Sequence, residues 1–280
     1  MSKSSVQVRL NCAQLSLCGH LLAESQRFGQ FLNRRISMLV TIWFIFAVLA
    51  GGLKILLLRA SLTHAAMSTT LVPQIVPYAL IALAPAAGWA IVGRCCAHGT
   101  LAAQPKLRLA KVGSWTSVSS NEAHQRQYFG MSGLLVSLVA GLLLSMLMRL
   151  GEYLLAIPAI PATAPRWALA MFDAMTFDLV YLSFLYSVCI AMALKAAPLF
   201  PRMLAYTWLC DLLMQGAIAR YTINAGGLPS EVAAPLQAFL LGNIKKVLIS
   251  VMIWLPYLLV SNRVNVTFRQ RVRHQTIFAW

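Results

Sequence analysis

Long apolar segments recur six times along the chain, separated by shorter polar segments. A helix needs about 20 residues to cross the roughly 30 Å hydrocarbon core of a bilayer, and each segment approaches or exceeds that length. The segments are continuous, whereas the strands of a transmembrane barrel alternate between apolar and polar residues. They therefore predict six membrane-spanning helices, with the bounds 36–58, 71–92, 131–148, 167–194, 203–219 and 236–260.

Basic residues fall mainly into alternate gaps between these segments. Five Lys or Arg precede the first segment, five lie between the second and third, two between the fourth and fifth, and four follow the sixth. The remaining gaps hold one, two and one. Because cytoplasmic segments of membrane proteins are enriched in Lys and Arg, we predict an all-α fold. It is a multi-pass transmembrane helix bundle of about six spans with both termini in the cytoplasm.

Composition agrees with a membrane protein, since 59% of the residues are hydrophobic and only 11% are charged. The net charge of +16 favours contact with anionic lipid headgroups at the cytoplasmic surface of the lipid bilayer. We therefore expect no nucleic-acid partner. The six cysteines lie in or near spans or on the predicted cytoplasmic side, so no disulfide framework is expected.

The pattern divides the chain into five regions. Residues 1–35 form a cytoplasmic segment with two alternatives, a helix on the membrane surface or a disordered tail. Residues 36–93 form a transmembrane hairpin, 94–128 a basic cytoplasmic loop, 129–269 a four-span membrane domain and 270–280 a cytoplasmic tail. The second helix of the hairpin contains Pro73, Pro77 and Pro85, so we expect it to be bent or broken.

Small residues recur every four positions in the third span, at Gly133, Ser137, Gly141 and Ser145. Such a stripe lets a second helix approach closely in a membrane. We expect it to pack against spans four to six, and a seam between two copies of the chain is the alternative.

Three carboxylates lie inside predicted spans, which is costly in hydrocarbon. Asp178 in span four and Asp211 in span five fall at a similar depth, so we expect a shared intramembrane polar site. Asp173 lies nearer the outer face, at a depth comparable with Lys245 and Lys246 of span six. An ion pair with one of these lysines is one interpretation. The other is that the lysines extend outward to the interface.

The inner pair has two interpretations as well. Hydrogen bonds from Asp178 and Asp211 to Tyr181, Thr207 or Gln215 would hold the helices together. Alternatively, the two carboxylates form part of an ion or proton pathway. The sequence alone does not distinguish helix association from an ion or proton pathway.

A compact motif closes the last span, with the pattern W-x-P-Y-x-x-x-S-x-R-V-x-x-T-F. Its residues are Trp254, Pro256, Tyr257, Ser261, Arg263, Val264, Thr267 and Phe268. The motif resembles the signature of the DUF2569-like family, bacterial four-span inner-membrane proteins of unknown function. Phe200, Pro201 and Arg202 resemble the F-P-R element of that family, as does Asp211 in the following span. The resemblance covers about residues 129–269 and implies a bacterial inner (plasma) membrane protein.

Elementary chemistry also accounts for this motif. Trp254 and Tyr257 suit the aromatic belt of a membrane interface, Pro256 bends a helix and Arg263 fixes its cytoplasmic end. Alternatively, Ser261 and Arg263 bind a lipid phosphate or the carboxylate of a partner.

Catalytic motifs are missing from the sequence, which contains no H-E-x-x-H, no phosphate-binding glycine loop and no nucleophile elbow. We expect no enzymatic activity, no cofactor and no metal site. Two classes of function remain. The first is an accessory, regulatory or protective protein, such as an immunity protein, that binds another membrane protein. The second is a small proton- or cation-coupled transporter, or a subunit of one, that uses Asp178 and Asp211.

Overall fold

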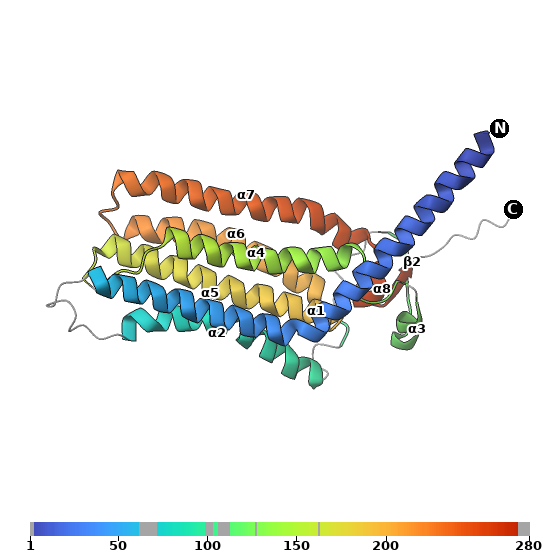
Figure 1. The fold of residues 1–280 in the computed structure, drawn as a ribbon, viewed down its shortest axis with the longest axis horizontal. Coiled ribbons are helices and arrows are strands. Elements are labelled where there is room, and N and C mark those ends of the chain that lie inside the picture. Colours follow the sequence, from blue (N-terminus) through green and yellow to red (C-terminus); the bar gives the residue numbers. More distant parts are fainter. Residues whose placement is uncertain are drawn as a thin grey trace.

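One long helix occupies each of the six apolar segments in the computed structural model (Figure 1). The structure describes residues 3–61, 72–98, 103–105, 113–126, 128–161 and 163–273. The long helices are α1 (Lys3–Ser61), α2 (Val72–Ala97), α4 (Leu134–Ala156), α5 (Arg166–Leu194), α6 (Phe200–Asn224) and α7 (Ser230–Val260). They run side by side along the length of the molecule, and the first part of α1 projects beyond the others (Figure 1).

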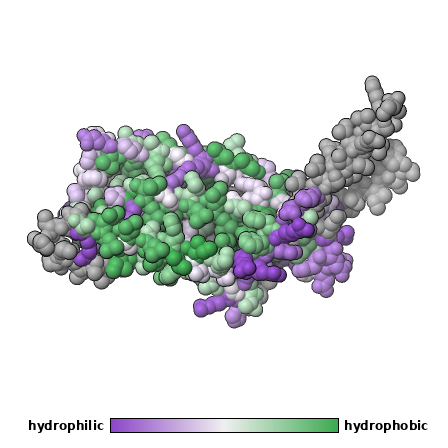
Figure 2. Space-filling view, viewed as in Figure 1, coloured by the Kyte–Doolittle hydropathy of each residue, from purple (hydrophilic) through white to green (hydrophobic). Residues whose placement is uncertain are grey.

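Five of these helices, α1, α2, α4, α5 and α7, contain stretches that are long and apolar enough to cross a membrane. Such helices are typical of a multi-pass membrane protein, and hydrophobic residues cover most of the middle of the bundle on the face shown in Figure 2. α6 is not one of the five. Its 25 residues span about 38 Å at 1.5 Å per residue, but it carries Arg202, Asp211 and Arg220.

α5 lies at the centre of the bundle, where α2, α4 and α6 pack around it. Most of its residues are buried, although Asp173 and Phe177 are exposed, and a helix buried in this way is apolar around most of its surface. α1 packs on α2 and α4, while α7 packs mainly on α6. Of the five candidate spans, α7 is the least buried inside the bundle.

Two glycines of the predicted hairpin mark close helix contacts. A Cβ atom at Gly88 of α2 would lie 2.0 Å from Ser187 Oγ and 2.8 Å from the Phe184 carbonyl oxygen, both on α5. A Cβ atom at Gly51 of α1 would lie 2.7 Å from the Tyr78 ring of α2. Only glycine fits at either position. The hairpin is thus separate from residues 129–269 in sequence but not in packing.

Several expected boundaries differ from the structure. α1 runs without a break from Lys3 through the first predicted span, so no separate surface helix or tail precedes that span among the described residues. α2 is a single helix with Pro77 and Pro85 inside it, so it is not broken at either proline. α4 ends at Ala156 and not near Met148, which places Arg149 inside the helix.

Short elements gather at one end of the bundle, which we call the α8 end (Figure 1). They are α3 (Ser120–Gln125), α8 (Asn262–Arg269) and the three-residue strands β1 (Trp115–Ser117) and β2 (Arg271–Arg273). The strands pair antiparallel, with Trp115 opposite Arg273 and Ser117 opposite Arg271. This ladder joins the basic loop to the C-terminal tail. Among the described residues, its two strands are the exception to an all-helical fold.

Candidate functional site

Arg149 of α4 joins the two inner aspartates. Its Nη1 donates to Asp178 Oδ2 of α5 at 3.1 Å, and its Nη2 lies 2.5 Å from both carboxylate oxygens of Asp211 of α6. Asp211 is fully buried, and the side chains of Arg149 and Asp178 are about nine-tenths buried. One guanidinium group therefore links three helices at the level of both carboxylates.

Neutral side chains complete the cluster. The Tyr186 hydroxyl donates to Asp211 Oδ2 at 2.8 Å. Gln215 Nε2 donates to Asp178 Oδ1 at 3.2 Å, and Gln215 Oε1 accepts from Asn243 Nδ2 of α7 at 3.3 Å. The cluster thus extends to a fourth long helix. We call these six residues the Arg149 cluster: Arg149, Asp178, Tyr186, Asp211, Gln215 and Asn243.

The charges in this cluster do not balance. Two carboxylates face one guanidinium group, so the cluster is formally negative by one charge when both are ionised. Burying such charges is costly, and the attraction between them offsets the cost only when the geometry and the remaining hydrogen bonds are good. Here each carboxylate also accepts from a neutral donor. Removing the cation would leave both carboxylates uncompensated.

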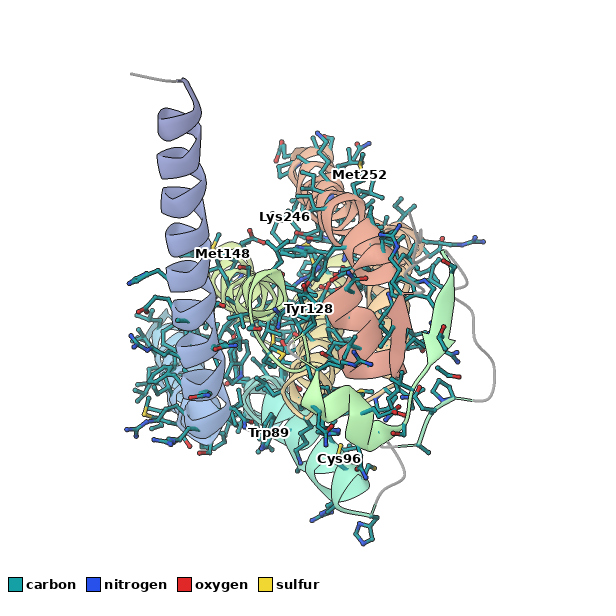
Figure 3. The ribbon with its side chains drawn as sticks, turned by 90° about the vertical axis from the view of Figure 1, so that its right-hand side faces the viewer. Trp89, Cys96, Tyr128, Met148, Lys246 and Met252 are labelled. Carbon is teal, nitrogen blue, oxygen red and sulfur yellow. The ribbon has the colours of Figure 1, made fainter. Side chains whose placement is uncertain are left out.

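The Arg149 cluster is reached from a cleft between α4 and α7. This cleft has a volume of about 250 Å³. Gly141, Ser145 and Arg149 line it from α4, and Lys246 and Ser250 line it from α7, with Tyr186 and Asp211 behind them. Met148 and Lys246, labelled in Figure 3, lie on the two helices that border it. Charged and hydroxyl groups therefore face a lateral opening in the bundle.

The small-residue stripe does not pack as expected. Ser137 and Gly141 are exposed, and a Cβ atom at Gly141 would meet no heavy atom within 4 Å. The side of α4 that packs against the bundle is its leucine-rich side, including Leu135, Leu138 and Leu142. Gly141 and Ser145 instead form one wall of the cleft. The expectation of close internal packing at Gly141 is therefore wrong. Gly133, at the head of the stripe, precedes α4 with a positive φ of 61°, a conformation that favours glycine.

The outer ion pair also differs from expectation. Lys246 pairs with Glu152 of α4 across the cleft, not with Asp173. Asp173 and Lys245 are exposed and form no ion pair with any residue that the structure describes. Asp173 lies beside Phe177 and Tyr221 in a separate hollow between α5 and α6. Of the five expected polar residues, only Asp178 and Asp211 come together.

The motif residues form a corner between α7 and α8. Ser261 ends α7 and precedes α8, and its carbonyl accepts from the backbone N–H of Asn265 at 3.1 Å. The Trp254 and Tyr257 rings meet edge to face at 6.0 Å near the end of α7. Pro256 lies inside the same helix.

Contacts from this corner reach the segment before α4 and the start of α6. Arg263 donates to Ser132 Oγ, and the Gly130 N–H donates to Thr267 Oγ1 at 3.0 Å. The rings of Phe268 and Phe200 lie 4.8 Å apart. Fully buried members of the corner are Val264, Phe268 and Phe200, with Pro201 also buried. Most of the motif therefore has a structural role, and Arg263 binds a protein hydroxyl in this structure.

Arg149 was expected in the loop after the third span, because a charged residue at the end of an apolar segment resembles the start of a loop. The signal against a loop was the apolar pattern after it, at Leu150, Tyr153, Leu154 and Leu155. Glu152, Tyr186 and Asn243 were missed as well. Of the expected hydrogen-bond partners, Gln215 binds Asp178, whereas Thr207 binds the Met203 carbonyl and Tyr181 binds Cys210.

No family model, no curated protein and no solved structure matches this chain. The resemblance to the DUF2569-like family therefore stays a prediction that rests on the motif. The site has to be interpreted from its own geometry.

Proposed function

We propose that this protein is a non-enzymatic accessory, regulatory or protective component of a bacterial inner membrane, and that it binds a transmembrane helix of another protein. The observation that carries the proposal is the α4–α7 cleft. Its wall contains Gly141 and Ser145, which allow close approach of a second backbone. Its polar groups open toward a region where lipid tails offer no hydrogen-bond partner.

The length of the cleft suits such a helix. From Gly141 to Glu152 along α4 is eleven residues, or roughly 16 Å, which is about three helical turns. The Glu152–Lys246 pair closes the cleft at one end. The hydroxyl groups of Ser145 and Ser250 lie along it and would bind an amide or hydroxyl side chain of the partner.

Copurification from native membranes tests this proposal. Gly141→Leu fills the cleft, and Gly52→Leu is the matched control, because Gly52 is also exposed in an apolar helix and has no atom within 4 Å of a built Cβ. We expect the parent and Gly52→Leu to retain one stoichiometric membrane protein and Gly141→Leu to lose it without a fall in thermal stability. Retention by Gly141→Leu would reject the cleft as the binding site.

The charge imbalance supports a second candidate, a small proton- or cation-coupled transporter. The cleft reaches Asp211 and Tyr186, and the unpaired formal charge leaves room for one proton in the Arg149 cluster. Flux in reconstituted vesicles separates the candidates. A transporter loses proton-coupled flux in Asp178→Asn and Asp211→Asn, whereas an accessory protein shows no flux even as the parent.

Six spans and cytoplasmic termini form part of the same proposal. The support is that the α8 end carries most of the described arginines outside the spans, including Arg202, Arg263 and Arg269. Cysteines introduced singly at Gly226 and Glu122, in a background without native cysteines, test it. We expect an impermeant thiol reagent applied to intact cells to label position 226 and not position 122. The reverse labelling would reject this orientation.

A further inference from the structure

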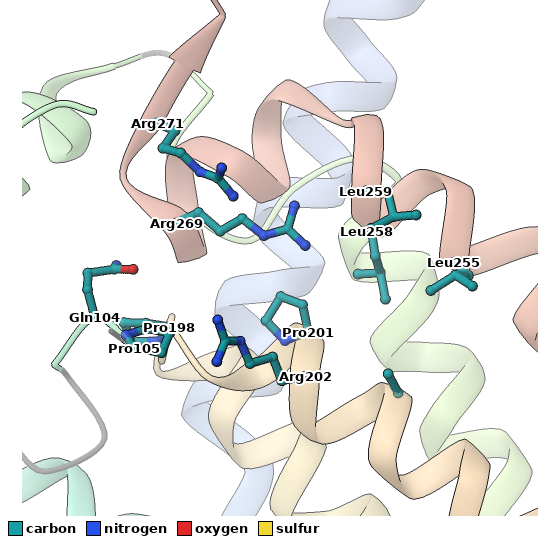
Figure 4. A pocket seen from close by; sticks show the side chains of 11 residues that line it. Gln104, Pro105, Pro198, Pro201, Arg202, Leu255, Leu258, Leu259, Arg269 and Arg271 are labelled. Carbon is teal, nitrogen blue, oxygen red and sulfur yellow. The ribbon is translucent and has the colours of Figure 1, made fainter. Parts of the chain in front are cut away.

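Three arginines from separate parts of the chain line one cavity at the α8 end. The cavity has a volume of about 250 Å³. Arg202 enters it from the first turn of α6, Arg269 from the end of α8 and Arg271 from β2 (Figure 4). Arg271 is more than nine-tenths buried. Of the eleven described residues that line the cavity, none has a carboxylate.

The fold holds these side chains close despite their like charges. Arg269 donates to Asn265 Oδ1 at 3.0 Å, and Gln104 donates to the Phe268 carbonyl at 3.1 Å. The β1–β2 ladder fixes the strand that carries Arg271. Burial, followed by the charges of Arg271 and Arg202, lowers the pKa of Arg269 to about 10. Arg269 therefore keeps its charge at neutral pH, but that charge is less stable here than in water, and a bound anion would offset the difference.

The opposite wall of the cavity is apolar. Leu255, Leu258 and Leu259 come from the last turns of α7, where the helix reaches the end of the bundle (Figure 4). A ligand that fits both walls has an anionic head and an apolar remainder. Guanidinium groups bind phosphate through paired N–H donors, which explains why a site of this kind uses arginine and not lysine.

We propose that Arg202, Arg269 and Arg271 form a binding site for a phosphate group, carried either by an anionic phospholipid headgroup or by a soluble phosphate. This site lies at the α8 end, away from the α4–α7 cleft, and does not depend on the partner proposed above. It is also distinct from Arg263, which is held by Ser132.

Binding of a fluorescent phosphatidic acid to the full chain in an uncharged detergent tests the proposal. We expect saturable binding that weakens about tenfold in Arg202→Gln and in Arg269→Gln, because each variant loses hydrogen bonds to a charged group. Arg273→Gln is the matched control, since Arg273 is exposed on the same strand as Arg271. We expect its affinity to change less than twofold.

Competition identifies the source of the phosphate. Displacement of the probe by inorganic phosphate supports a soluble ligand, whereas displacement by unlabelled phosphatidic acid alone supports a lipid. Phosphatidylcholine with the same acyl chains should not compete in either case. Arg202→Lys and Arg269→Lys keep the charge and provide the test if a glutamine variant fails to fold. Equal affinity in the parent, the Arg202 and Arg269 variants and Arg273→Gln would overturn the proposal.

Discussion

The contact between α2 and α5 and the cleft between α4 and α7 use glycine in opposite ways. At Gly88 a Cβ atom would overlap Ser187 and the backbone of α5, whereas at Gly141 it would meet open space. Gly141 belongs to a regular stripe of small residues, and Gly88 does not. Periodicity on one helix therefore shows only what that helix permits. The position of the neighbouring backbone decides whether a close contact is made.

The two sides of the bundle also differ in the polar contacts that they contain. At Gly88, α2 and α5 are closely packed, and such packing gains dispersion energy from many small contacts. On the other side, the leucine-rich side of α4 is also buried, but the Arg149 cluster adds polar contacts among α4, α5 and α6, and Asn243 of α7 joins it through Gln215. The side with the open cleft therefore combines apolar packing with a buried polar cluster.

Removing the charge of Arg149 should have the largest effect. Arg149→Gln leaves two buried carboxylates without a cation, and breaking a buried ion pair in this way costs about 3 to 5 kcal/mol. We expect a large fall in the thermal unfolding temperature in detergent. Arg220→Gln is the control, since Arg220 is exposed on α6 and its loss should change stability little. Equal stability of the two variants would show that the Arg149 cluster does not hold the helices together.

Adding one methyl group at Gly88 should have the next largest effect. Gly88→Ala places Cβ against Ser187 Oγ and the Phe184 carbonyl, so α2 and α5 must move apart at a cost of about 1 to 3 kcal/mol. Unfolding of purified protein in detergent measures this loss. Gly88→Ala combined with Ser187→Ala should recover part of it, because Ser187 Oγ is the nearest obstacle. A Gly88→Ala variant as stable as the parent would contradict the close contact.

The positions of the helices could be predicted because apolar length is a local property, and each of the six segments corresponds to one helix. The contacts between helices in the interior could not be predicted in this way. Arg149 ends an apolar run, and only the positions of Asp178 and Asp211 on other helices show that it is buried. The pairing of β1 with β2 joins strands of three residues, which are too short to show a period. Likewise, Arg202, Arg269 and Arg271 are scattered basic residues until the fold brings them to one cavity.

The smallest effect, and the sharpest test of the comparison, should come from the same substitution in the open cleft. Gly141→Ala adds a methyl group where no atom lies within 4 Å, and alanine has the higher helix propensity. We therefore expect the free energy of unfolding to stay unchanged or to rise by up to about 1 kcal/mol.

The sign of the change at Gly141 distinguishes the two uses of glycine. If both Gly88→Ala and Gly141→Ala destabilise the purified protein, the cleft is closed in detergent and the stripe packs after all. If Gly141→Ala destabilises the protein only in native membranes, the contact that it disturbs belongs to a partner. If the purified protein tolerates alanine at position 141 but not at position 88, the small-residue stripe is free to contact a second helix. The proposed function requires this condition.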